Sequence, residues 1–164
     1  VSVRIVFIDT VPLIDKYRKD PEDYPSASGQ NMERQLRWLD KELASAREQW
    51  VVVVGHHPVF AHTSKDESER TDLQQRLLPI LKRHKVDMYI CGHVHNFQHI
   101  RQEGSEIDFI VNSAASLSRP KVSKIEGTVF VSGEAGFSVL RCEKESLRLD
   151  MINGEGKKIY SVCR

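Results

Sequence analysis

The stretch WVVVVGHHP, at residues 50–58, decides the fold because an unbroken apolar strand ends there in a glycine and two histidines. A second apolar run, Val86–Ile90, leads in the same way into CGHVHN at residues 91–96. Strands this apolar are typical of a parallel sheet that is buried on both faces. Sites in open parallel sheets lie beyond the carboxyl ends of the strands. Both histidine clusters are therefore expected to face one crevice.

Outward from these two strands, the first half of the chain alternates strands and helices. Residues 3–8 predict a strand buried on both faces, and residues 31–47 carry an apolar stripe with helical spacing. Thr71 begins a capping-box pattern that opens a second helix, and Pro79 inside this helix is expected to kink it or to break one backbone hydrogen bond. Residues 11–30, rich in proline and charge, are expected to form a long surface loop.

Beyond residue 95 the alternation with helices stops. Short strands separated by glycine-containing turns are predicted at residues 97–101, 107–112, 128–131, 137–142, 146–152 and 158–162. Because strand follows strand without a crossover helix, this part of the chain is expected to be antiparallel. The predicted fold class is therefore α/β, with mixed β-sheet layers flanked by helices.

The composition is that of one ordinary folded domain. The chain has 164 residues, and its formal net charge of +1 gives no basic excess for binding nucleic acid. No apolar run approaches the roughly 20 residues of a membrane span, and no signal segment precedes the first strand. The chain begins directly in a strand at Val1, without a methionine, as expected of one cut inside a domain or processed before it.

The three cysteines are too few for a disulfide framework, and no Cys-x-x-Cys pair points to a thiolate metal site. At most one bridge can form. Cys142 with Cys163 is the better pair, because both belong to the C-terminal group of strands, and free, partly buried thiols are the alternative.

Histidines at the strand ends are the candidate metal ligands. His93 and His95 are two residues apart, so an extended segment would direct both imidazoles to one side, beside His56 from the other strand. A single histidine at a strand end is ordinary. Two Gly-His clusters, each after a buried strand, favour a metal site formed by His56, His93 and His95.

The remaining histidines have less direct assignments. His57 and His62 are candidates for a catalytic role beside the ligands or the substrate, the alternative being ordinary loop residues. His84 is expected to complement a helix dipole, and His99 is expected to lie along a strand.

The pair of motifs GHHPVF, residues 55–60, and CGHVHN, residues 91–96, resembles the calcineurin-like metallophosphoesterases. The subfamily with the greater resemblance is the small purple, or tartrate-resistant, acid phosphatases, through softer matches at Phe7–Thr10, Gln35–Leu39, Arg76–Leu81 and Gly133–Phe137. The resemblance covers essentially the whole chain. It implies an α/β/β/α sandwich, present here as a partial domain in which residues 1–164 are the C-terminal half.

The resemblance implies metal-dependent hydrolysis of phosphomonoesters by the intact protein, with two metal ions, Fe paired with Zn, Mn or Fe. By this resemblance His56 and His93 would bind the divalent ion and His95 the ferric ion. The implied partners are phosphorylated small molecules or phosphoproteins, with neither nucleic acid nor a membrane span, and the implied location is secreted, periplasmic or lysosomal.

The resemblance also shows what differs. The family's first-half motifs, including the aspartate that bridges the metals, do not occur here, and Asp9 and Asp15 do not match them. The upstream half of the domain is thus an expected partner, and the chain alone is expected to bind fewer ions or none and to be inactive. Where mammalian-type enzymes place a proton-donating histidine, this chain has Lys65, and His62 is the nearest substitute. The alternatives are a phosphodiesterase of the same superfamily and a non-catalytic module that binds a structural Zn²⁺ or no metal.

Overall fold

A six-stranded mixed sheet forms the centre of the structure, a computed structural model that describes all 164 residues. Its strand order is β1, β2, β3, β5, β4, β6, with bounds Val3–Phe7, Trp50–Val54, Met88–Cys91, Asp108–Val111, Phe97–Ile100 and Thr128–Ser132. β1, β2, β3 and β5 pair in parallel, whereas β4 pairs antiparallel with both β5 and β6. The prediction of a wholly antiparallel second half is therefore wrong for β5, whose crossover from β3 passes through β4 rather than through a helix.

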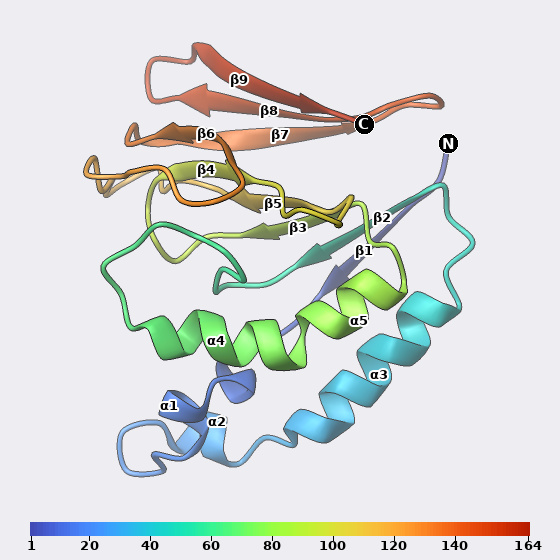
Figure 1. The fold of residues 1–164 in the computed structure, drawn as a ribbon, viewed down its shortest axis with the longest axis vertical. Coiled ribbons are helices and arrows are strands. Elements are labelled where there is room, and N and C mark those ends of the chain that lie inside the picture. Colours follow the sequence, from blue (N-terminus) through green and yellow to red (C-terminus); the bar gives the residue numbers. More distant parts are fainter.

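A separate three-stranded antiparallel sheet covers one face of the large sheet. Its strands β7, β8 and β9 are adjacent in that order, with bounds Gly136–Cys142, Leu147–Asn153 and Lys158–Cys163. The helices lie on the opposite face, so the described residues form three layers: helices, large sheet, small sheet (Figure 1). The predicted α/β class with mixed sheet layers flanked by helices is confirmed.

Three longer helices make up most of the helical layer. They are α3 (Met32–Ala44), α4 (Glu67–Arg76) and α5 (Leu78–Arg83). Residues 11–30 are not a plain loop as predicted, because they contain the short helices η1 (Val11–Leu13), α1 (Asp15–Arg18) and α2 (Pro25–Ser28). Leu13, Ile14 and Ala27 are buried, which explains why this segment packs down instead of remaining on the surface. None of the helices has the length and apolar character that a membrane crossing requires.

The start of α4 differs from the predicted capping box. Asp66 is the N-cap residue, and its carboxylate accepts the backbone N–H of Ser68. Thr71 lies inside the helix, where its hydroxyl donates to the carbonyl of Glu67 one turn earlier. Pro79 does not lie inside one helix as predicted, because α4 has ended before it and Pro79 lies in the first turn of α5, where its missing N–H is tolerated.

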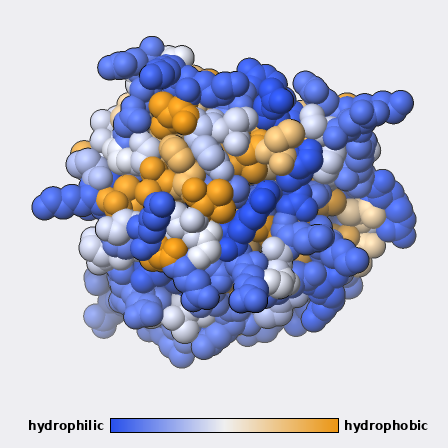
Figure 2. Space-filling view, turned by 45° about the horizontal axis from the view of Figure 1, so that its top comes forward, coloured by the Kyte–Doolittle hydropathy of each residue, from blue (hydrophilic) through white to orange (hydrophobic).

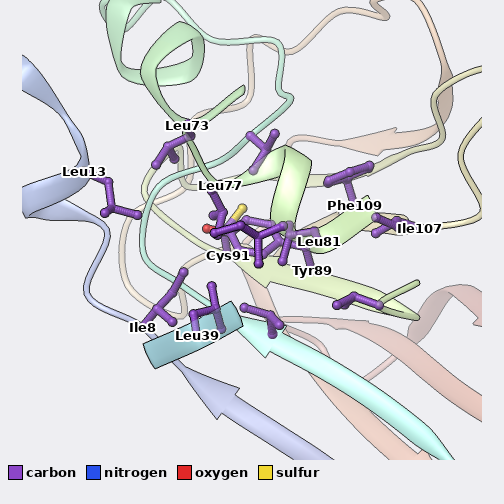
Figure 3. Close-up of a cluster of buried hydrophobic side chains, with 14 of the residues drawn as sticks. Ile8, Leu13, Leu39, Leu73, Leu77, Leu81, Tyr89, Cys91, Ile107 and Phe109 are labelled. Atoms are coloured by element: carbon purple, nitrogen blue, oxygen red, sulfur yellow. The ribbon is translucent and has the colours of Figure 1, made fainter. Parts of the chain in front are cut away.

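Two hydrophobic clusters occupy the two spaces between the layers. Leu39, Leu73, Leu77, Leu81, Tyr89 and Phe109 belong to the cluster beneath the helices (Figure 3). Val52, Met88, Phe97, Ile110, Leu149 and Met151 belong to the cluster between the two sheets. Neighbouring residues of one strand, such as Met88 and Tyr89, enter different clusters because side chains of a strand alternate between faces. This two-sided burial explains the unbroken apolar runs of β2 and β3.

β1 is buried on one face only, so the prediction of burial on both faces is wrong. Val6 and Ile8 belong to the cluster beneath the helices, but Ile5 is 42% exposed and Phe7 is 72% exposed. β1 is the edge strand of the sheet, with β2 as its one neighbour. Figure 2 shows apolar atoms gathered among hydrophilic ones on one face of the molecule.

The three cysteines are free thiols. Cys142 ends β7 and Cys163 ends β9, and β8 runs between these two strands. The intervening strand explains why the pair that looked best placed in the sequence is not bridged, and the alternative of free thiols is the one observed.

Candidate metal centre

The two Gly-His loops lie side by side because β2 and β3 are adjacent parallel strands. Val54 pairs with Ile90 at the carboxyl ends of these strands. The Gly55 N–H then donates to the Ile90 carbonyl at 3.0 Å, and the Gly92 N–H donates to the His56 carbonyl at 3.1 Å. These two bonds fix the loops to one another, so the predicted convergence of histidines on one edge of the sheet follows from strand pairing.

Three imidazoles meet at this edge: those of His56, His57 and His93. One nitrogen from each lies within 4.8 Å of the others. The closest pair is His93 Nδ1 and His56 Nε2, at 3.0 Å. The ring centroids of His57 and His93 are 4.2 Å apart. Imidazole nitrogens are preferred ligands of Zn²⁺, Fe, Cu and Ni, so this donor set fits a transition-metal ion.

The backbone after β3 is unusual at the histidines themselves. His93 has φ of 69° and His95 has φ of 59°, both in the left-handed region that residues other than glycine rarely adopt. Such conformations cost of order 1–3 kcal/mol and concentrate at functional sites. Gly92 itself has no positive φ, so the left-handed backbone of this turn is confined to the histidines that follow it.

Gly55 is needed for a different reason, close packing. A Cβ atom at Gly55 would lie 2.5 Å from Tyr89 Oη and 2.7 Å from Thr10 Cγ2. Both neighbouring side chains are fully buried, and the Tyr89 hydroxyl donates to the His57 carbonyl at 2.7 Å. The absence of a side chain at Gly55 thus lets the His57 segment approach β3.

The Gly55→Ala substitution is therefore expected to destabilise the chain by about 1–3 kcal/mol, as overpacking does in tightly packed interiors. Gly92→Ala is the matched control, because a Cβ there meets nothing within 4 Å, and it is expected to change stability little. Urea unfolding of both variants measures the difference. Equal stability of the two variants would contradict the close-packing role of Gly55.

A buried carboxylate, missed in the sequence, holds His93. Glu69 of α4 has a side chain that is 4% exposed, and its Oε2 lies 2.9 Å from His93 Nε2. Its Oε1 accepts the Tyr17 hydroxyl at 2.6 Å. Burial raises the pKa of Glu69, but the bonds from Tyr17 and His93 outweigh it and leave this pKa below its usual value. The carboxylate is thus ionised and accepts the Nε2 proton of His93, so the lone pair of this ring is on Nδ1, which faces His56.

His57 is buried and is held from the other side of the cluster. Its Nδ1 lies 2.8 Å from Thr10 Oγ1, and its backbone N–H donates to the same oxygen at 3.2 Å. Burial, together with the charges of His93 and His56, lowers the pKa of His57 to about 3. The ring is therefore neutral at physiological pH, as a metal ligand must be.

His56 and His93 also favour the neutral form. Burial is the largest cause of the lowered pKa of each ring. The Lys65 ammonium is the next largest cause at His56, so a positive charge lies close to the cluster. Neutral imidazoles do not attract anions by themselves, but each retains the lone pair that a metal ion needs.

His95 is placed separately from the three converging imidazoles. Its Nδ1 is buried and has no hydrogen-bond partner, which is rare for a buried polar atom. Its backbone carbonyl accepts the Arg119 N–H at 2.7 Å. A buried nitrogen without a partner fits a ligand position, so the residues present agree with the metal chemistry that the sequence predicts.

His62, the other catalytic candidate, is held more firmly than its sequence context indicates. Its backbone N–H and carbonyl both bond to the side chain of Gln98, and its Nδ1 accepts the Ser123 N–H at 3.2 Å. It does not belong to the group of converging imidazoles. One ring nitrogen of His62 is thus already bonded to the loop residue Ser123.

The last two histidines have structural surroundings. His84 follows α5, at the predicted helix end, and its Nε2 lies 2.9 Å from Asp40 Oδ1. His99 lies along β4, as predicted, and its ring bridges Asp108 at 2.7 Å and the Tyr160 hydroxyl at 2.8 Å. Its ring faces the small sheet and does not approach the metal cluster.

Comparison with known proteins agrees with this geometry. A family model described as calcineurin-like phosphoesterase matches residues 2–97, more than half of the chain. The tartrate-resistant acid phosphatase type 5 of Sus scrofa is 29% identical over 177 residues, covering 99% of this chain and 50% of that protein. The chain spans about half the length of the curated relatives it matches over its whole length.

Solved structures also resemble this chain. GAP50, described as the anchor in the inner membrane complex of Plasmodium, has a TM-score of 0.80 and 26% identity, covering 98% of this chain and 48% of that chain. A purple acid phosphatase from yellow lupin (Lupinus luteus) seeds has a TM-score of 0.65 and 18% identity, covering 82% of this chain and 28% of that chain, and supports the fold alone. The two Gly-His loops on adjacent parallel strands and the matching family model lead to one conclusion: the chain belongs to the calcineurin-like phosphoesterase family, with purple and tartrate-resistant acid phosphatases among its relatives.

Proposed function

We propose that the protein hydrolyses phosphomonoesters with the help of metal ions, and that His56, His93 and His95 are ligands from this part of it. The observation that carries the proposal is the meeting of His56 and His93 from two strand ends, with 3.0 Å between His56 Nε2 and His93 Nδ1. Bound metal ions supply Lewis-acid activation of water and neutralise charge on the phosphoryl oxygens. The natural place of action is proposed to be secreted, periplasmic or lysosomal, as in the resemblance.

In this proposal the chain's own residues orient the histidine rings and attract the phosphoryl group of the substrate. Glu69 and Thr10 fix the rings of His93 and His57. The Lys65 ammonium is the second largest cause, after burial, of the lowered pKa of His56. It therefore lies close to the cluster and attracts the negative phosphoryl group. Lys65 stands where relatives of the mammalian type place a histidine, so His62 is the proposed donor of a proton to the leaving oxygen.

A cavity next to the histidines fits the organic part of a substrate. Its volume is about 430 Å³, and its lining includes Val94 and Asn96, which flank His95, together with Thr63 and Ser64. Arg119 and Lys121 add positive charge at its border. The positive charge of this lining matches a phosphorylated small molecule or a phosphoprotein segment that carries more negative charge than the phosphate alone.

The chain of 164 residues by itself is expected to hydrolyse very little phosphomonoester. The cluster contains one buried carboxylate, Glu69, whose two oxygens already bond to His93 and Tyr17, so no carboxylate remains to bridge two ions. The measurement is turnover of an activated aryl phosphate, with metal content, by this chain and by a version that carries an upstream half. Rapid metal-dependent turnover by residues 1–164 alone would contradict the expectation, and inactivity of the longer version would contradict the proposed function.

A non-catalytic role is the second candidate, and the likeness to GAP50 favours it. That protein, described as an anchor, matches 98% of this chain with a TM-score of 0.80. In this alternative the histidine cluster would hold a structural ion or none, and the exposed face at β1 would contact another protein. A longer version that binds metal and shows no turnover of phosphomonoesters or phosphodiesters would favour this alternative, whereas turnover of diesters alone would make it a phosphodiesterase.

A further inference from the structure

We propose that residues 1–164 contain a complete site for a single divalent transition-metal ion, with His56 Nε2, His57 Nε2 and His93 Nδ1 as its ligands. The new element is His57, which supplies a third imidazole from within the chain. An ion held in this way needs no residue from elsewhere and no hydrolytic activity. The site therefore goes beyond the proposed function, which assigns His57 no bond to an ion.

The distances fit one ion. Zn–N bonds of about 2.0–2.1 Å in a tetrahedral site place ligand nitrogens about 3.3 Å apart. His93 Nδ1 and His56 Nε2 are 3.0 Å apart, and the donor atoms of all three rings lie within 4.8 Å of one another. Side-chain rotations of modest size thus bring the third nitrogen to bonding distance. The His56 ring is exposed, which leaves the fourth position open to water.

The outer nitrogens of the two inner rings are already held in the manner of metal-bound histidines. His93 Nε2 bonds to the Glu69 carboxylate at 2.9 Å, so its Nδ1 carries the lone pair. His57 Nδ1 bonds to Thr10 Oγ1 at 2.8 Å, and the tautomer that carries its proton on Nδ1 has the lone pair on Nε2. Thr10 is fully buried and Glu69 nearly so, so neither partner is free to turn away.

The burial of His57 also needs an explanation that packing does not give. Its ring is 3% exposed and lies between Tyr17, at a centroid distance of 5.4 Å, and His93, at 4.2 Å. An apolar side chain would fill that space without the cost of burying a polar ring. A bond from Nε2 to an ion would offset part of that cost.

Calorimetric titration of the 164-residue chain with Zn²⁺, and visible absorption with Co²⁺, tests the site. We expect one ion per chain, with tetrahedral Co²⁺ bands. His57→Phe, which keeps a ring in the space, is expected to weaken Zn²⁺ binding by at least about 100-fold, beyond the effect of losing an outer partner. Glu69→Gln is expected to weaken it by about 10–100-fold. His62→Ala is the matched control and is expected to change the affinity little.

His95→Ala separates this site from the one that the family resemblance implies. We expect His95→Ala to leave Zn²⁺ affinity within a few-fold of the unaltered chain, because His95 is outside the converging group. No binding by the unaltered chain, or binding that His95→Ala removes and His57→Phe preserves, would overturn the proposal. Circular dichroism identifies any variant that fails to fold, and Glu69→Gln, which keeps the side chain's shape, then decides. These readouts are independent of hydrolysis, so failure of the site and failure of the proposed activity are distinguishable.

Discussion

In a longer version that carries the upstream half and has the proposed activity, His93→Ala is expected to lower turnover by more than about 10⁴-fold, which exceeds the usual effect of losing a general acid. Its ring bonds to Glu69 on one side and approaches His56 on the other, so its removal breaks the centre of the cluster. A lost ligand also releases or displaces the ion, which removes activation of water and charge neutralisation together. The measurement is turnover with bound metal counted on the same sample.

His62→Ala is the comparison for that experiment. Its expected loss is within about 10²–10⁴-fold, larger for an alkyl phosphate than for an activated aryl phosphate, because poor leaving groups need the proton more. Bound metal is expected to stay unchanged. Full metal content and near-normal turnover in His93→Ala would remove His93 from the ligand set. Equal damage to both substrates and to metal binding in His62→Ala would make His62 a ligand.

Asp108→Ala is expected to cause the largest loss of stability, about 3 kcal/mol, because it removes a buried carboxylate from His99 and from two arginines. Asp108 is fully buried in β5, and its oxygens bond to His99 at 2.7 Å, Arg101 at 2.6 Å and Arg164 at 3.1 Å. Chemical unfolding measures the change. Asp40→Ala is the control, because Asp40 holds Arg83 and His84 at the surface, and a loss of the same size there would contradict the role of burial.

The same carboxylate predicts an acid-sensitive stability. Burial raises the pKa of Asp108, but bonds from His99 and Arg101 outweigh it and lower this pKa from 3.8 to about 2. A folded pKa below the unfolded one gives stability that is fully present above about pH 4 and is lost as the pH falls towards 2. The contribution is about 2–3 kcal/mol by linkage. Unfolding free energies of the unaltered chain and of Asp108→Ala, measured between pH 5 and pH 2.5, are expected to converge at the acid end.

The central strands and the edge where the site lies follow from local patterns. Val51–Val54 and the run that ends at Ile90 are apolar on both faces, which only a covered parallel sheet explains, and their Gly-His endings then fall side by side. β1 is also apolar except at Arg4, but it lies at an edge. A pattern reports which residues are apolar, whereas exposure depends on which strands become neighbours, so Ile5 and Phe7 were assigned incorrectly.

The burial of Glu69 could not be predicted from the sequence, for a related reason. It belongs to the charged run at residues 65–72, which reads as the solvated face of a helix. Its burial arises because α4 packs against α1, which carries Tyr17, and because His93 approaches from the end of β3. The capping residue was missed for a simpler reason, since Asp66 and Thr71 are both favourable caps in that run and only the packed position of the helix selects between them.

The edge strand β1 also affects how the chain reaches its folded state. β1 pairs with β2 in parallel, joining Val3 to Trp50 across a helical crossover, so the pairing forms only after a long loop has closed. Sheets built from such distant pairings fold slowly, and their open edges remain available to other chains during that time. The unpaired side of β1, with Phe7 exposed beside it, is the point at which refolding competes with intermolecular strand pairing. Refolding yield should therefore fall as protein concentration rises.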